Sequence, residues 1–140
     1  MSRLADKVAV ITGANSGIGL AAARRFAAEG ARVFATGRRQ AELDAAVREI
    51  GHQAIGVRGD VSRLADLDRL YDIVRQQAGR IDILFANAGG GEFAALGAVT
   101  EAHYERTFAT NVKGTLFTVQ KALPLLRPGA SVILTGSTAG

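Results

Sequence analysis

A glycine-rich segment near the N-terminus has the residue types and spacing of a phosphate-binding turn. It follows the apolar residues 8–11 and begins at Thr12. One glycine permits a sharp turn after a strand, a second leaves room for a pyrophosphate, and a third lets the next helix pack closely. Free N–H groups at the start of that helix favour an anion. The alternative is a glycine-rich turn without a ligand. The predicted contacts are Gly13, Asn15, Ser16, Gly17, Ile18 and Gly19.

Two arginines follow the second predicted strand, where a bound dinucleotide would place the ribose next to its adenine. A site for NAD usually has Asp or Glu here, which bonds the ribose 2′-hydroxyl. This sequence has Thr36-Gly37-Arg38-Arg39 and no acid. Guanidinium groups suit a 2′-phosphate. Arg38 and Arg39 are therefore expected to bind NADP(H), unless they are a solvated pair that starts the next helix.

Apolar periodicity predicts the elements that hold these residues. Short apolar runs predict strands, and stripes at helical spacing between them predict helices. One such stripe consists of Val112, Leu116, Val119, Leu123 and Leu126. Ser62 and Thr100 are expected to cap helices, and residues 127–129 are expected to end the last one. The strands are predicted at residues 8–11, 31–36, 54–58, 81–86 and 131–135.

The alternation of strands and helices predicts the fold class. Buried strands joined by helices pair in parallel through right-handed crossovers. We therefore expect an α/β fold, a Rossmann-type doubly wound sheet in three layers with strand order 3-2-1-4-5. Residues 1–140 are expected to form one NADP(H)-binding domain.

The composition excludes several classes of protein. Of the 140 residues, 48% are hydrophobic and 21% are charged, which is typical of a globular domain. The absence of cysteine rules out a disulfide scaffold, a cysteine-based zinc site and a thiol nucleophile, and with only two histidines no metal site is expected. No apolar run approaches the roughly 18 residues that span a bilayer, and no signal-peptide core is present. We therefore expect a cytoplasmic protein without a membrane partner.

The positive charge does not indicate binding to nucleic acid. There are 17 Lys and Arg against 13 Asp and Glu, a net charge of +4. The basic residues are dispersed, acids stand among them, and no pattern of aromatic and basic residues suits base stacking. An arginine-rich solvated surface explains the composition.

Five motifs follow one another at the predicted strand ends and within the long last helix. In this order they resemble the short-chain dehydrogenase/reductase family, and the match runs from Lys7 to Gly140. The three residues between Gly13 and Gly17 are similar to the compact branch of that family. The motifs are Thr12-Gly13 with Gly17 and Gly19, Asp60-Val61, Asn87-Ala88-Gly89, Asn111-Val112-Lys113-Gly114, and Gly136-Ser137.

The resemblance implies a role for each of the later motifs. Asp60 is similar to the acid that bonds the adenine amine, with the Val61 backbone beside it. Asn87, Ala88 and Gly89 resemble the segment that lies along the cofactor and steadies the sheet. Taken by itself, Asp60 could simply be an acid at a helix entry, and Asn87 could cap a turn.

Two further residues resemble catalytic positions of the family. Asn111 is similar to a helix-interrupting Asn whose backbone carbonyl holds a water in a proton relay. Asn is also a poor helix former, which favours an irregularity there. Ser137 resembles the serine that hydrogen-bonds the substrate carbonyl or hydroxyl. A lone serine after a strand more often only caps a turn.

One part of the family pattern is missing from these residues. The family's acid–base Tyr follows that serine, and a Lys four residues further on lowers the pKa of the Tyr and binds the ribose. Here Tyr71 and Tyr104 are followed at that spacing by Arg75 and Phe108. Tyr71 also belongs to a core stripe. We expect this sequence to be part of a longer enzyme.

Three functions follow from these observations. The first is an NADP(H)-dependent oxidoreductase acting on a small carbonyl or alcohol substrate, of which these residues bind the cofactor. The second is a non-catalytic NADP(H)-binding module, and the third is a remnant with only structural glycines. Asn111 and Ser137 favour the first, because binding alone needs neither. Helical residues 100–126 resemble the family's subunit interface, so a homodimer or homotetramer is expected.

Overall fold

The computed structural model describes residues 2–137, in which strands and helices alternate as predicted. A π-helical turn at Ala109–Lys113 separates the last two α-helices, and short 3-10 turns lie at Leu96–Ala98 and Leu123–Leu125. The elements are β1 (Val8–Thr12), α1 (Gly17–Ala28), β2 (Arg32–Gly37), α2 (Gln40–Ile50), β3 (Ile55–Arg58), α3 (Leu64–Gln77), β4 (Ile81–Ala86), α4 (Glu101–Phe108), α5 (Gly114–Ala122) and β5 (Leu126–Leu134).

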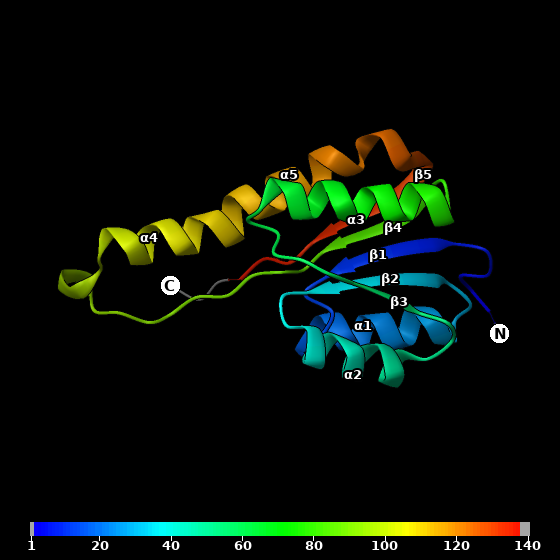
Figure 1. The fold of residues 1–140 in the computed structure, drawn as a ribbon, viewed down its shortest axis with the longest axis horizontal. Coiled ribbons are helices and arrows are strands. Elements are labelled where there is room, and N and C mark those ends of the chain that lie inside the picture. Colours follow the sequence, from blue (N-terminus) through cyan, green and yellow to red (C-terminus); the bar gives the residue numbers. More distant parts are fainter. Residues whose placement is uncertain (1, 138–140) are drawn as a thin grey trace.

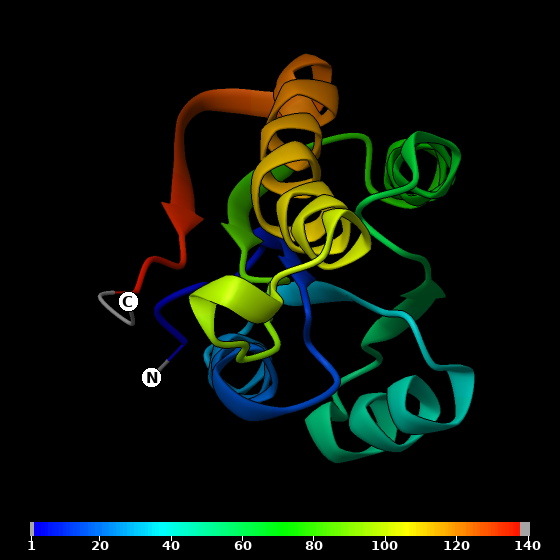
Figure 2. The ribbon, with the colours of Figure 1, turned by 90° about the vertical axis from the view of Figure 1, so that its left-hand side faces the viewer.

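The strands form one parallel sheet in the order β3-β2-β1-β4-β5. This confirms the predicted doubly wound α/β fold. Helices α1 and α2 cover one face of the sheet and α3 and α5 cover the other, while α4 extends beyond the carboxyl ends of the strands (Figure 1). The view toward the carboxyl ends of the strands places β5 at one edge and β3 at the other (Figure 2).

Alternate side chains of the central strands enter two separate cores. Val10 of β1 and Phe34 of β2 pack with α3 residues on one face, whereas Ile11 packs with Leu43 of α2 on the other. All five residues of β1 are buried, as expected for a strand covered on both faces. Full burial of each aliphatic side chain contributes about 1.5–3 kcal/mol. Within residues 2–137, no helix has the length and apolarity to cross a bilayer.

Two boundaries differ from the sequence prediction. Ser62 does not cap α3: Arg63 is the N-cap, and the Ser62 hydroxyl donates to Asp60 Oδ1 at 2.7 Å. Thr100 does cap α4, because its side chain accepts from the His103 N–H. Residues 127–129 belong to β5 and not to the end of a helix, since pairing with β4 jumps from Leu126 to Ser131 across a bulge. A bulge accommodates Pro128 because no ladder hydrogen bond is required of it.

The predicted apolar stripe on the last helix does not face the core as a unit. Val112, Leu116 and Leu123 are more than half exposed. Thr118 and Ala122, with Gly114, are the residues of α5 that are buried. The outer stripe continues along α4 with Tyr104, whose ring stacks on Phe108 at 4.4 Å between centroids.

Tyr71, expected in the core, is buried and joins α3 to α5. Its hydroxyl donates to the Thr118 carbonyl oxygen at 2.6 Å. Burial raises the pKa of Tyr71, so the phenol keeps its proton.

We expect Tyr71→Phe to lower the free energy of unfolding by about 1 kcal/mol, as for one net hydrogen bond. Urea denaturation followed by circular dichroism measures this, and an unchanged midpoint would show that the bond does not stabilise the fold.

Candidate nucleotide-binding site

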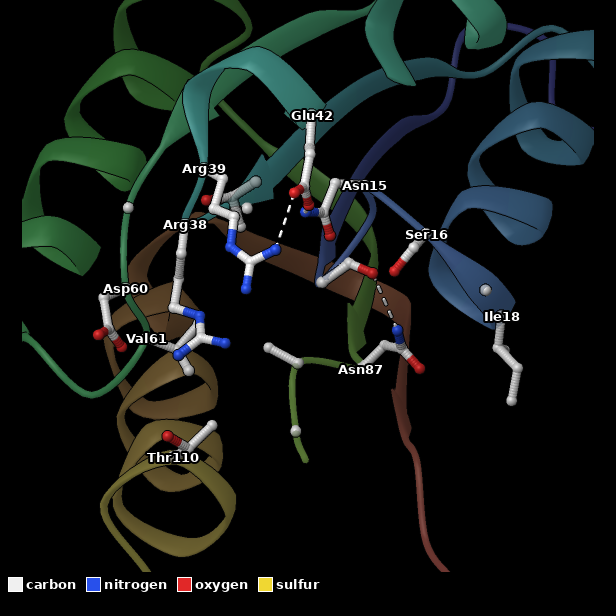
Figure 3. Close-up of a pocket in the computed structure, with 17 residues that line it drawn as sticks. Asn15, Ser16, Ile18, Arg38, Arg39, Glu42, Asp60, Val61, Asn87 and Thr110 are labelled. Carbon is white, nitrogen blue, oxygen red and sulfur yellow. Dashed lines mark hydrogen bonds and ion pairs between the residues drawn. The ribbon is translucent and has the colours of Figure 1, made fainter. Parts of the chain in front are cut away.

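A cavity of about 450 Å³ lies where β1, β2, β3 and β4 end. Figure 3 shows Asn15, Ser16 and Ile18 on one side of it and Arg38, Asp60 and Val61 on the other. Thus the structure brings together residues from four separate strand ends. Of the residues predicted to bind a nucleotide, those that line the cavity are Gly13, Asn15, Ser16, Gly17, Ile18, Arg38, Arg39, Asp60, Val61, Asn87, Ala88 and Gly89.

The glycine turn leaves open space at the start of α1. Gly17 has φ +55, and a Cβ added to it would meet no atom of the described chain within 4 Å. Ser16, the N-cap, makes no side-chain hydrogen bond to the helix within residues 2–137. The first N–H groups of α1 are therefore available to an anion in the cavity.

Gly19 has a packing role. A Cβ there would lie 2.2 Å from the Gly13 carbonyl oxygen and 2.6 Å from Asn87 Nδ2. Such distances are far inside van der Waals contact, so any larger residue would push α1 away from the turn. Gly13, at φ +62, is also confined, because its added Cβ would lie 2.9 Å from Ala88 Cα. The two glycines let α1 and the segment after β4 meet at the turn.

Thr12 and Asn87 connect three strand ends. The buried Thr12 hydroxyl accepts from the N–H groups of Asn87 at 3.0 Å and Ala88 at 2.9 Å. Asn87 Nδ2 donates to the Gly13 carbonyl at 3.2 Å, and Thr135 Oγ1 donates to Asn87 Oδ1 at 2.7 Å. The network holds the ends of β1, β4 and β5 in register. The sequence analysis assigned no separate role to Thr12, although a threonine at a buried strand end indicates such a hydrogen bond.

The irregularity expected at Asn111 is present as the π-helical turn. The Asn111 side chain accepts from the Gly90 N–H at 3.0 Å and donates to the carbonyls of Gly90 at 2.6 Å and Thr107 at 2.9 Å. Its backbone carbonyl, the group that the resemblance assigns to a water, accepts from Thr115 Oγ1 at 2.8 Å. Asn111 therefore fixes the loop that follows β4.

Ser137 lies at the end of the described residues, three positions beyond the end of β5. It is exposed. Neither it nor Asn111 is among the described residues that line the cavity. Asn111 nevertheless lies beside the cavity, because its side chain bonds Gly90 and its neighbour Thr110 lines the cavity wall.

The cavity wall carries charges of both signs. Burial favours a raised pKa for Asp60, but hydrogen bonds from the Ser62 hydroxyl and N–H and the charges of Arg38 and Arg63 outweigh it and lower the pKa. Asp60 is therefore ionised at neutral pH. In the described chain, no hydrogen bond or close ion pair engages the Arg38 guanidinium.

Five lining residues were not predicted to contact a nucleotide: Thr36, Gly37, Glu42, Gly59 and Thr110. Gly37 is the last residue of β2 and Gly59 follows β3, so their places at strand ends could have been inferred. Thr110 precedes the predicted Asn111. Glu42 lies in α2, and only the fold brings it to the cavity.

The cavity fits a nucleotide bearing phosphates, because it combines open helix N–H groups, an ionised carboxylate and arginines. Residues 7–140 match the family model described as short chain dehydrogenase. The chain belongs to the short-chain dehydrogenase/reductase family. Members of this family bind NAD or NADP and catalyse hydride transfer.

The matches to known proteins extend over almost the whole chain. The oxidoreductase asL5 of Sarocladium schorii is 52% identical over an alignment of 142 positions, which covers 100% of this chain and 57% of that protein. Galactitol 2-dehydrogenase of Agrobacterium fabrum is 40% identical, over 99% of this chain and 55% of its own length. The crystal structure of a short-chain dehydrogenase/reductase titled glucose/ribitol dehydrogenase, from Brucella melitensis, superposes with a TM-score of 0.94 at 29% identity and covers 97% of this chain and 59% of that one. The chain thus spans a little over half the length of these relatives.

The open space at Gly17 can be tested with a side chain that tolerates positive φ. Asn adopts this conformation more readily than other non-glycine residues. We expect Gly17→Asn to weaken nicotinamide dinucleotide binding about tenfold or more, because the amide would occupy the space of the pyrophosphate. Fluorescence titration measures the affinity, and circular dichroism checks that helix content is kept.

Gly51 provides the matched control. It has φ +65, nothing of the described chain within 4 Å of an added Cβ, and a place at the end of α2 away from the cavity. Gly51→Asn therefore places the same side chain at another positive-φ glycine without blocking the cavity. With ψ −153 at Gly51 the backbone cost is high, so circular dichroism is needed for this variant too. Equal affinity in the two variants would show that the phosphates do not lie at Gly17.

Proposed function

We propose that this chain is the NADP(H)-binding part of an oxidoreductase that transfers a hydride between NADP(H) and a small carbonyl or alcohol substrate. Membership of the short-chain dehydrogenase/reductase family supports the hydride chemistry. The observation that carries the cofactor preference is Arg38, which lines the cavity at the end of β2 where the sequence has no acid. A guanidinium suits a 2′-phosphate.

Residues of the cavity would each bind a different part of the cofactor. The N–H groups at Gly17 would bind the pyrophosphate, the ionised Asp60 would accept from the adenine amine, and Arg38 would bind the 2′-phosphate. Val61 and the segment Asn87 to Gly89 would line the bound molecule. Bound NADP(H) supplies or accepts the hydride, while the protein orients it.

We propose that Asn111 takes part in proton transfer and that Ser137 binds the substrate. Ser137 would hydrogen-bond the substrate oxygen, and the Asn111 carbonyl would hold a water. The acid–base Tyr and its Lys are not among residues 1–140. Tyr71 cannot replace that Tyr, because it is buried and its hydroxyl is bonded to Thr118.

A non-catalytic NADP(H)-binding module is the second candidate. Tyr71 is committed to the core and Tyr104 has Phe108 where the family has Lys, so these residues by themselves contain no acid–base pair. Such a module would bind the nucleotide and turn over no substrate in any longer form of the chain.

We also propose that the protein is a homodimer or homotetramer. The apolar side chains exposed along α4 and α5, among them Tyr104, Phe108 and Leu116, support this. Exposed apolar patches of this kind commonly mark interfaces. The cytoplasmic location expected from the sequence stays a prediction.

The cofactor preference is tested at Arg38. Loss of a charge-assisted hydrogen bond of about 1.5–3 kcal/mol should weaken NADPH binding in Arg38→Ala by roughly 10- to 150-fold and leave NADH binding almost unchanged. Arg63→Ala is the control, since Arg63 also acts on the charge of Asp60 but is not among the described residues lining the cavity. Tighter binding of NADH than of NADPH by the unaltered protein would refute the assignment.

Residues 1–140 expressed alone should show no dehydrogenase activity, because they lack the Tyr and Lys that handle the proton. They should also be poorly soluble, since β5 is a sheet edge within the described chain and exposes Val132, Ile133 and Leu134. The assay is NADPH oxidation with a panel of ketones. A soluble and active product would overturn the proposed division of roles.

A further inference from the structure

A second acid, besides Asp60, lines the cavity, although no acid directly follows β2 in the sequence. Glu42, in the first turn of α2, lines the cavity together with Arg38 and Arg39. Its Oε1 lies 2.8 Å from Arg39 Nη1, and its Oε2 accepts from Asn15 Nδ2 at 3.3 Å. One carboxylate thus engages both the second predicted arginine and the glycine turn (Figure 3).

Gly37 makes this arrangement possible. A Cβ added to Gly37 would lie 3.1 Å from Asn15 Cγ. The Asn15 side chain therefore packs directly over the end of β2, and its amide reaches across to α2. The carboxylate of Glu42 consequently lies between the turn that would bind the pyrophosphate and the strand end that would bind the ribose.

The pair between Arg39 and Glu42 is accessible to a ligand. The Arg39 side chain is 71% exposed and the Glu42 side chain 50% exposed. An ion pair in such a place is weak, because water screens it. Arg39 can therefore leave Glu42 for a stronger anion, but the carboxylate charge remains beside the site.

We propose that Glu42 determines how strongly this site distinguishes NADP(H) from NAD(H). Its carboxylate holds Arg39 away from a 2′-phosphate and repels that phosphate, whereas a ribose 2′-hydroxyl can donate to it. Glu42 thereby takes the role of the acid that is missing after β2. It reduces the preference for NADP(H) over NAD(H) that Arg38 confers. This inference rests on the proposed function in one respect, namely that the adenosine part of the cofactor occupies the cavity.

A purely structural role for Glu42 makes a different prediction. An acid in the first turn stabilises a helix through its dipole. If that were its whole contribution, removal of the charge would change thermal stability and would leave the choice between nucleotides unaltered.

The test is Glu42→Gln, probed with 2′,5′-ADP and 5′-AMP in isothermal titration calorimetry. These probes differ only at the ribose 2′ position and require no substrate or turnover. We expect 2′,5′-ADP to bind to the Glu42→Gln variant about 3- to 10-fold more tightly than to the unaltered protein. The variant lacks the repulsion between the carboxylate and the 2′-phosphate, and its Arg39 is released from Glu42. Binding of 5′-AMP should stay equal or weaken.

Asp44→Asn is the matched control. Asp44 is an acid of the same helix that accepts from Gln40 Nε2 and is not among the described residues lining the cavity. Removing its charge should leave the ratio of the two affinities unchanged. In an Arg39→Ala background, the gain from Glu42→Gln should become smaller, because part of it depends on the released guanidinium.

The outcomes separate the two proposals. An unchanged affinity ratio in Glu42→Gln, or an equal change for both probes, overturns the role of Glu42 and leaves the proposed function intact. Tighter binding of 5′-AMP than of 2′,5′-ADP by the unaltered protein refutes the NADP(H) preference, while the shift caused by Glu42→Gln still measures the effect of the carboxylate. If neither probe binds the unaltered protein, both proposals fail.

Discussion

The candidate site depends on one buried hydroxyl, that of Thr12 at the carboxyl end of β1. It accepts from the N–H groups of Asn87 and Ala88, so the backbone after β4 turns toward β1 and satisfies its donors there. Asn87 passes the connection on to the Gly13 carbonyl and to Thr135. Because buried polar groups are costly when unpaired, this network fixes the glycine turn and the segment along the cavity relative to each other.

Charges of opposite sign lie near one another around the cavity. Asp60 has Arg38 and Arg63 near it, and Glu42 has Arg39. The Arg39 and Glu42 side chains bond each other, whereas no ion pair joins Asp60 and Arg38 within the described residues. The carboxylate of Asp60 suits an amine, and the guanidinium of Arg38 suits a phosphate. Glu42 is proposed to act against that phosphate, so the charges around the adenosine site would come from the ends of β2 and β3 and from helix α2.

Two surfaces outside the cavity, one on α4 and α5 and one on β5, expose apolar side chains. The chain spans a little over half the length of the relatives that it matches. The π-helical turn that follows α4 is connected to the loop after β4, because the Asn111 side chain exchanges hydrogen bonds with the Gly90 backbone.

The sequence by itself determined the alternation of strands and helices, the glycine turn and the strand-end motifs, because local periodicity and backbone freedom depend on neighbouring residues. The strand order was expected from the fold class that this alternation indicates. It also predicted the irregularity at Asn111, since Asn disfavours helix. Other features were decided by the tertiary structure. Glu42 meets Asn15, which is 27 positions away, and Asn111 meets Gly90, which is 21 positions away. Ser62 bonds Asp60 in place of capping a helix, and a bulge places Pro128 in β5. Such contacts depend on how strands and helices pack, and no local pattern encodes which distant side chains will then lie within hydrogen-bonding distance.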